Sequence, residues 1–321
     1  MHLPPKCKIA LFDLGSSALK LQIMEVNRDK YNSVFFQKYD TNLKQGIGST
    51  GDINDTTISM VVDIFNKCLA ITREHNVFAS YIVATDALRK AANKAVLTKK
   101  IEEIIHTDVN IVTQIQEARL FWLAATQNLK PSYDSPLITF DIGGGSVQIC
   151  CGTRQNLKKI YTFNTGAVIL FEKFIKHDPC LPSEFNDLKN FISDQLAVID
   201  FSGSRKSIII HGSSSIVNFY RETGFKFNEC LYTKDEKIQV NINETQRMIN
   251  KIIALSIDER RKLFPSRPNF MDMAYVGLTY VTMLANKFDL NVEIPTNRSI
   301  VDGIMYVIQS SSLQDFFKDT K

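Results

Sequence analysis

Two stretches of this chain share one pattern: ALFDLGSSA at residues 10–18 and ITFDIGGGS at residues 138–146. Each has an apolar run, an aspartate, one more apolar residue and then small residues, which is typical of a strand that ends in a tight turn. A second apolar segment follows each turn at once, at residues 19–26 and 147–152. The pattern therefore predicts two hairpins, and their repetition predicts two duplicated domains.

The small residues of both turns predict an anion site. Glycine and serine leave backbone N–H groups uncovered, and concave sets of such groups bind phosphate. The candidate phosphate-binding residues are Gly15, Ser16 and Ser17 in the first turn and Gly143, Gly144, Gly145 and Ser146 in the second. The preceding aspartates, Asp13 and Asp141, are candidate Mg²⁺ ligands, directly or through water. One such turn alone is common punctuation between strands, so it is the matching pair that favours a functional site.

Strand and helix patterns alternate through the rest of the chain, which predicts an α/β fold. The segment at residues 128–136 contains two prolines and several turn-forming residues, and the second hairpin begins just after it. We therefore expect a first domain at residues 1–128 and a second at 129–321. The second domain carries helical additions, and its last helix, near residues 302–311, is able to pack back on the first domain.

Composition indicates a soluble, folded chain. Of the 321 residues, 44% are hydrophobic and 22% charged, and the net charge of +4 comes without a long basic run, so nucleic acid is not indicated. The six cysteines are scattered, and the first ten residues contain no secretory pattern, which favours a reducing, cytoplasmic location. The longest apolar segment, at residues 273–286, is shorter than the ~20 residues that a membrane span requires. Oligomeric state stays open, a homodimer included.

Four blocks of sequence, in order, carry a family resemblance. Residues 13–18 (DLGSSA) are similar to Asp-x-Gly-Ser-Asn-Ser, and residues 84–93 (ATDALRKAAN) to Ala-Thr-x-Ala-x-Arg-x-Ala-x-Asn. Residues 113–120 (TQIQEARL) are similar to Ser-Gly-x-Glu-Glu-Ala-Arg-Leu, and residues 141–148 (DIGGGSVQ) to Asp-x-Gly-Gly-Gly-Ser-x-Glu. In these blocks the chain resembles the exopolyphosphatase/guanosine pentaphosphate phosphatase family. The resemblance implies the short two-domain form of an actin-like ATPase (ribonuclease H-like) superfold, with duplicated domains around a phosphate-binding cleft.

The resemblance also implies roles for single residues. Glu117 matches the glutamate expected to orient or deprotonate the attacking water; the alternative is a glutamate that only favours a helix N-terminus. Arg89 matches an arginine whose guanidinium holds a phosphate oxygen; the alternative is a surface arginine. Lys20 stands where the family has an arginine and would add a point charge, unless it is merely solvated. Asp86 is predicted to cap the helix that carries Arg89.

A further loop has a weaker resemblance. Gly212, Ser213 and Ser214 follow the predicted strand at residues 206–210 and resemble the family's Gly-x-x-Gly-Thr loop, which implies another phosphate contact. An ordinary helix cap is the alternative. The five histidines are dispersed without ligand spacing, so a zinc site is not expected.

Three departures from the family pattern bear on the chemistry. Gln148 stands where the family has glutamate, Gln116 replaces the first glutamate of a pair, and Ser17 replaces an asparagine. Glutamine neither acts as a base nor supplies the charge that a metal ion prefers. The leading hypothesis is a Mg²⁺-dependent hydrolase that releases terminal orthophosphate from inorganic polyphosphate or guanosine pentaphosphate. The alternatives are a catalytically weakened relative that senses a phosphate-rich ligand, and a sugar or acetate kinase of the same superfold.

Overall fold

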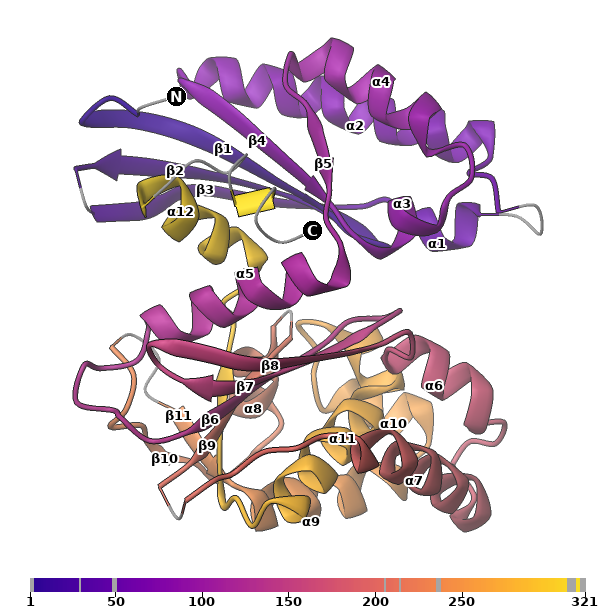
Figure 1. Ribbon diagram of the computed structural model, residues 1–321. Helices are drawn as coiled ribbons and strands as arrows, with labels where there is room; N and C mark the ends of the chain where they lie inside the picture. The colour runs from indigo at the N-terminus through magenta and orange to yellow at the C-terminus, as the bar shows by residue number, and fades with distance from the viewer. Residues whose placement is uncertain are drawn as a thin grey trace. The chain divides into compact units, whose positions relative to one another are not determined.

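The computed structural model describes residues 3–28, 30–47, 51–204, 206–213, 215–234, 238–310 and 316–317. The chain forms two units, each built on a mixed β-sheet with helices (Figure 1). Unit 1 comprises Met1–Glu117 and Ile304–Lys321, and unit 2 comprises Ala118–Gly303. The boundary expected at residue 128 differs from this division, because helix α5 (Gln114–Gln127) runs unbroken through Glu117 and the prolines come only after it.

Unit 1 holds a five-stranded sheet in the order β3-β2-β1-β4-β5. The pairs β1/β2 and β2/β3 are antiparallel, whereas β4 is parallel to both β1 and β5. Its strands are β1 (Lys6–Leu14), β2 (Ala18–Asn27), β3 (Lys30–Asp40), β4 (Ala79–Ala84) and β5 (Val109–Ile111). Its helices are α1 (Leu43–Gly46), α2 (Asp55–Glu74), α3 (Asp86–Lys90), α4 (Lys94–Ile105) and the start of α5.

The core of unit 1 lies between the sheet and the helices α2 and α4 (Figure 1). Apolar residues of α2 recur at helical spacing and are buried on one face, as the sequence predicts. Phe65 of α2 stacks on Phe12 of β1 at 5.5 Å between ring centroids. The side chain of Asn54 caps α2 by accepting a hydrogen bond from the N–H of Thr57. This packing fixes β1, the strand that carries Asp13.

Unit 2 holds a seven-stranded sheet in the order β10-β11-β12-β9-β6-β7-β8. Its strands are β6 (Leu137–Ile142), β7 (Val147–Thr153), β8 (Asn156–Phe163), β9 (Ile208–Gly212), β10 (Asn228–Glu229), β11 (Ile238–Asn241) and β12 (Val292–Thr296). Its helices are α6 (Ala167–Phe174), α7 (Pro182–Ala197), α8 (Ile216–Glu222), α9 (Ile242–Ile253), α10 (Ile257–Lys262), α11 (Ala274–Lys287), the 3₁₀ helix η1 (Pro268–Asp272) and the start of α12 (Ile300–Ser310).

The predicted duplication is visible in the sheets. Strands β8-β7-β6-β9-β12 of unit 2 repeat the order and directions of β3-β2-β1-β4-β5 in unit 1. The two hairpins also share their register, since Asp13 lies opposite Lys20 and Asp141 lies opposite Gln148. The α/β class predicted from the repeat is therefore confirmed.

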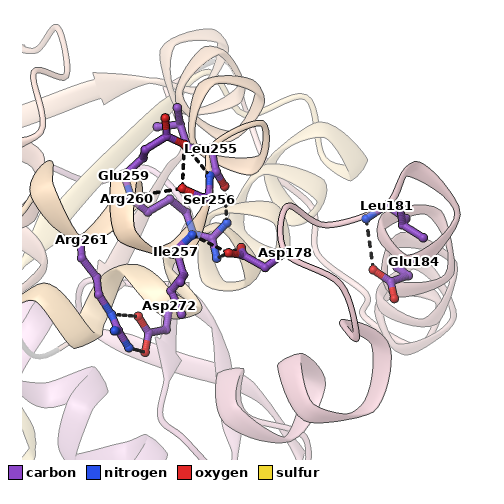
Figure 2. Close-up of polar contacts among 10 residues, drawn as sticks. All are labelled: Asp178, Leu181, Glu184, Leu255, Ser256, Ile257, Glu259, Arg260, Arg261 and Asp272. Carbon is purple, nitrogen blue, oxygen red and sulfur yellow. Dashed lines mark hydrogen bonds and ion pairs between the residues drawn. The ribbon is translucent and has the colours of Figure 1, made fainter.

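The helical additions of unit 2 are held by a buried arginine. The side chain of Arg260 in α10 is only 2% exposed and ion-pairs with Asp178 at 2.9 Å, while donating to the Leu255 carbonyl (Figure 2). The neighbouring Arg261 makes two 2.8 Å bonds to the Asp272 carboxylate. The adjacent Arg260 and Arg261 are thus both used in structural ion pairs.

The longest apolar segment of the chain forms α11, whose residues are mostly buried in the core of unit 2. In the described part of the chain, no helix combines the length and apolarity needed to cross a bilayer. All six cysteines are free thiols.

Candidate functional site

Both hairpin turns close with the same backbone hydrogen bond. In unit 1 the N–H of Gly15 donates to the Ala18 carbonyl at 2.9 Å, and in unit 2 the N–H of Gly143 donates to the Ser146 carbonyl at 3.0 Å. The duplication therefore extends from strand order to the conformation of the turns.

The first turn is held from behind, which directs its amides outward. The carbonyls of Ser16 and Ser17 accept hydrogen bonds from the backbone N–H groups of Lys44 (3.0 Å) and Thr41 (3.0 Å). In a trans peptide the carbonyl and the following N–H point in opposite directions. The N–H groups of Ser17 and Ala18 consequently point away from these donors, in the arrangement that an anion requires.

The second turn is held in the same way by the start of α6. The carbonyl of Gly143 accepts from the N–H of Ala167 at 2.9 Å, and that of Gly144 accepts from Val168 at 3.1 Å. By the same trans-peptide geometry, the N–H groups of Gly144 and Gly145 point away from α6.

Gly166, which the sequence analysis missed, makes this approach of α6 possible. A Cβ atom at Gly166 would lie 2.4 Å from the Gly143 carbonyl oxygen and 2.5 Å from the Gly145 nitrogen. Any larger residue would push α6 away from the turn. The contact joins segments distant in sequence, so no local pattern announces it.

Asp13 and Lys20 form an ion pair across the first hairpin. The Lys20 ammonium lies 2.9 Å from Oδ2 of Asp13, and the two side chains are 27% and 8% exposed. Lys20 therefore lies beside the carboxylate that the sequence marks as a metal ligand, close to the turn.

Arg89 and Glu117 form the second charged pair of unit 1. Nη1 of Arg89 donates to Oε2 of Glu117 and to the carbonyl of Val112, both at 2.8 Å. The two side chains are 16% and 14% exposed. Nη2 of Arg89 is buried and makes no hydrogen bond to the described residues, so this edge of the guanidinium, 3.8 Å from Asp86, can still donate to a ligand.

Asp86 is a charged neighbour whose place here the sequence analysis did not predict. It is the first residue of α3 and not its cap, because Thr85 occupies the N-cap position. Its Oδ1 lies 2.8 Å from the Lys90 ammonium and 3.8 Å from Nη2 of Arg89. The four-residue spacing of Asp86 and Lys90 on a helix was the available signal.

These neighbours set the acidity of Glu117. Burial raises the pKa of the Glu117 carboxyl, Arg89 opposes that shift, and the Asp13 and Asp86 carboxylates add to it. The net result is a pKa above the ordinary glutamate value.

Gln148 and Ser146 form a buried polar pair in unit 2. Nε2 of Gln148 donates to the Ser146 hydroxyl oxygen at 2.9 Å, and the two residues are 2% and 4% exposed. On the neighbouring parallel strand, Gly212 lies in register beside Asp141. The expected site residues of unit 2 thus gather at one end of its sheet.

Gln116 has two structural tasks at the start of α5. Its Oε1 accepts from the N–H of Thr113 at 2.8 Å, which gives α5 a capping interaction. Its Nε2 donates to the Phe317 carbonyl at 3.1 Å, which a glutamate carboxylate could not do.

Of the predicted phosphate-binding segments, the loop after β9, with Gly212 and Ser213, has the fewest features that favour a phosphate contact. A Cβ atom at Gly212 would lie 2.2 Å from the ring of Phe121 in α5, so close packing explains this glycine. The Ser213 carbonyl accepts from Ile216 at 3.1 Å as α8 begins. Ser214 lies outside the described residues.

A buried carboxylate fixes the strand before this loop and the helix after it. Glu293 of β12 hydrogen-bonds with Nδ1 of His211 at 2.6 Å and accepts from the hydroxyls of Thr245 and Tyr220. Burial and the Glu293 charge raise the pKa of Tyr220 well above its usual value. His211 is therefore part of a structural network.

The carboxylates fit a magnesium ion that arrives with phosphate. Mg²⁺ is commonly held by one or two carboxylates, with water and substrate phosphates completing the octahedron. Asp13 offers one such carboxylate in unit 1 and Asp141 one in unit 2. Among the described residues no group of three or more potential metal ligands comes together, so an all-protein metal cage is not formed.

The solved structure of an Aquifex aeolicus protein of the Ppx/GppA family resembles this chain. The TM-score is 0.83 at 19% identity, and the match covers 96% of this chain and 100% of that one. This likeness confirms the expected actin-like ATPase fold.

Curated relatives agree with this likeness. "Exopolyphosphatase 2" of Mycobacterium tuberculosis is 20% identical over 92% of this chain and 97% of its own length. "Bifunctional 3-dehydroquinate synthase/phosphatase" of Fusobacterium nucleatum is 24% identical over 79% of this chain, and the match spans only 39% of that longer protein. The model of the Ppx/GppA phosphatase family matches residues 22–310. Together with the duplicated fold and the two phosphate-type turns, this match shows that the chain belongs to the Ppx/GppA phosphatase family.

Proposed function

We propose that the chain hydrolyses the terminal phosphoanhydride bond of inorganic polyphosphate or guanosine pentaphosphate and releases orthophosphate. The observation that carries the proposal is the Arg89–Glu117 pair at 2.8 Å, with a raised pKa at Glu117 and a buried Nη2 on Arg89 left for a ligand. The name of the Mycobacterium relative supports the same class of substrate.

In this mechanism Glu117 orients a water molecule and accepts its proton as the water attacks the terminal phosphorus. Phosphoryl transfer passes through a loose transition state, so the protein mainly positions groups and balances charge. Arg89 hydrogen-bonds the terminal phosphate through Nη2 while Nη1 keeps its bond to the Val112 carbonyl. Each turn offers its amides to phosphate oxygens, and in unit 1 the Lys20 ammonium adds positive charge.

Asp13 and Asp141 are the residues that would hold magnesium. When bound, the ion neutralises charge on the phosphate oxygens. Removing one of these carboxylates, by Asp13→Asn or Asp141→Asn, should therefore raise the Mg²⁺ concentration needed for half-maximal phosphate release.

A second candidate function is a catalytically weakened member that binds a phosphate-rich ligand as a sensor. Two observations favour it: the neutral Gln148 amide donates to Ser146, and the Gln116 side chain caps α5 and donates to the Phe317 carbonyl. Neither side chain can act as a base.

Phosphate release assays separate the two functions. Purified protein is incubated with long-chain polyphosphate or guanosine pentaphosphate, with Mg²⁺ or with EDTA, beside the Glu117→Gln variant. Release that requires Glu117 supports the hydrolase. If the wild-type protein binds both compounds but releases no more phosphate than the variant, the sensor function replaces it.

A further inference from the structure

The Gln148–Ser146 pair has a hydrogen-bond direction that a glutamate could not produce. The Gln148 amide Nε2 is the donor, and the Ser146 hydroxyl oxygen is the acceptor, at 2.9 Å. An ionised glutamate only accepts hydrogen bonds, so with a carboxylate at position 148 the serine would have to donate its proton. The residue at position 148 therefore decides which way the Ser146 hydroxyl points.

A hydrogen bond keeps these two side chains together. Ser146 directly precedes β7, Gln148 is the second residue of that strand, and the 2.9 Å hydrogen bond places their side chains next to each other. They are 4% and 2% exposed, which restricts the serine to few conformations. Within the described residues, the hydroxyl makes no hydrogen bond other than the one it accepts from Gln148. Its proton is thus left for an acceptor that the described residues do not supply.

The surroundings indicate an anionic acceptor. Ser146 ends the turn whose Gly144 and Gly145 amides point away from α6, and a hydroxyl donor extends that set of N–H donors. Gln148 adds no second negative charge beside the Asp141 carboxylate, which lies opposite it in the hairpin, so it does not increase the repulsion of an anion. A carboxylate in its place would both repel the anion and accept the serine proton.

We propose that Gln148 holds the Ser146 hydroxyl with its proton turned toward the ligand, so that the second hairpin binds a phosphate oxygen by direct hydrogen-bond donation. The inference rests on the proposed function in that the ligand is a phosphate chain. Gln148 is then a positioning residue that acts through Ser146, and it favours phosphate oxygens held without an intervening metal ion.

Calorimetric titration with inorganic tripolyphosphate in EDTA tests this proposal, because it needs no turnover and excludes Mg²⁺. Ser146→Ala should weaken binding roughly tenfold or more, as expected for a lost hydrogen bond to a charged group. Gln148→Glu should weaken it to a similar or greater extent. Gln148→Met, whose thioether is only a weak acceptor, should weaken binding less than Gln148→Glu does, since the serine hydroxyl can still donate although it is no longer held in place.

The combined variant distinguishes action through Ser146 from an independent effect of charge. If Gln148 acts through Ser146, Gln148→Glu should weaken binding less in a Ser146→Ala background than in the wild-type protein. Gln155→Glu, in the exposed turn at the other end of β7, is the matched charge control and should bind like wild type.

Three results would overturn the proposal: equal loss in the Met and Glu variants, simple multiplication of the Ser146 and Gln148 effects, or unchanged affinity in Ser146→Ala. The proposed function fails separately, if the wild-type protein neither binds tripolyphosphate nor releases phosphate.

Discussion

Replacing Glu117 with glutamine removes the proposed base while changing the shape of the site very little. Glutamine retains an Oε1 that can accept from Arg89, and Arg89 keeps its 2.8 Å bond to the Val112 carbonyl. Both partners therefore stay in position. Only the ability to take a proton from water and one negative charge are lost.

The expected effect on catalysis is large, and the expected effect on stability is small. Loss of a general base typically lowers a rate by roughly 10²–10⁴. At about 1.4 kcal/mol per factor of ten, this corresponds to about 3–5 kcal/mol of activation free energy. Because burial already disfavours the ionised form of Glu117, the neutral glutamine should lower the free energy of unfolding by no more than about 2 kcal/mol.

Two measurements on the same preparation test the expected fall in rate and the expected small change in the free energy of unfolding. Phosphate release from polyphosphate gives kcat and KM, and urea denaturation gives the free energy of unfolding. We expect kcat to fall with KM nearly unchanged. Near-wild-type kcat would remove Glu117 from the mechanism, and a fall in kcat matched by a large loss of stability would show that Glu117 is structural.

Three further outcomes follow from the same contacts. Because the base must be ionised, kcat/KM should fall on the acid side with an apparent pKa above the ordinary glutamate value of about 4.3. Asp86→Asn removes a negative charge that raises the Glu117 pKa, so it should move this fall to lower pH. An unchanged pH-rate profile in the variant would contradict this reasoning. Arg89→Ala should raise KM roughly tenfold, with Arg89→Lys recovering only part, because an ammonium lacks the planar fork; equal KM values in all three proteins would make Arg89 structural. Gly166→Ala, whose Cβ would lie 2.4 Å from the Gly143 oxygen, should lower the free energy of unfolding by roughly 1–3 kcal/mol, measured by urea denaturation. An unchanged free energy of unfolding would show that α6 can shift freely.

The repeat was enough to predict two hairpins and duplicated domains because it encodes both strand pairing and register, whereas the actin-like superfold was implied by the family resemblance. Two apolar runs separated by a tight turn can pair only as a hairpin, and the matching aspartates set the two hairpins in one register. The division of the units at Glu117 was not predictable in the same way. Proline and turn residues mark where a helix stops, whereas a boundary within α5 depends on packing between segments distant in sequence.

Within the candidate site, the sequence predicted the two turns but not the contacts that hold them or the neighbours of Arg89. The amide-rich turns were readable from glycine and serine alone, but the donors that hold them from behind, at Thr41, Lys44 and Ala167, carry no signature because only their backbone takes part. Asp86 was assigned to capping because a single sequence does not show that its carboxylate faces the guanidinium of Arg89.

The duplicated scaffold carries different chemistry in its two units. At the same hairpin position, opposite the aspartate, unit 1 has the charged Lys20 and unit 2 the neutral Gln148. Lys20 ion-pairs with its aspartate, whereas Gln148 donates a hydrogen bond to the Ser146 hydroxyl oxygen. The turn backbones are alike, so the side chain at this one position is what distinguishes the two hairpins. Under the proposed function, the hairpin of unit 1 would meet a phosphate with a cation, and the hairpin of unit 2 would meet it with uncharged donors beside the Asp141 carboxylate.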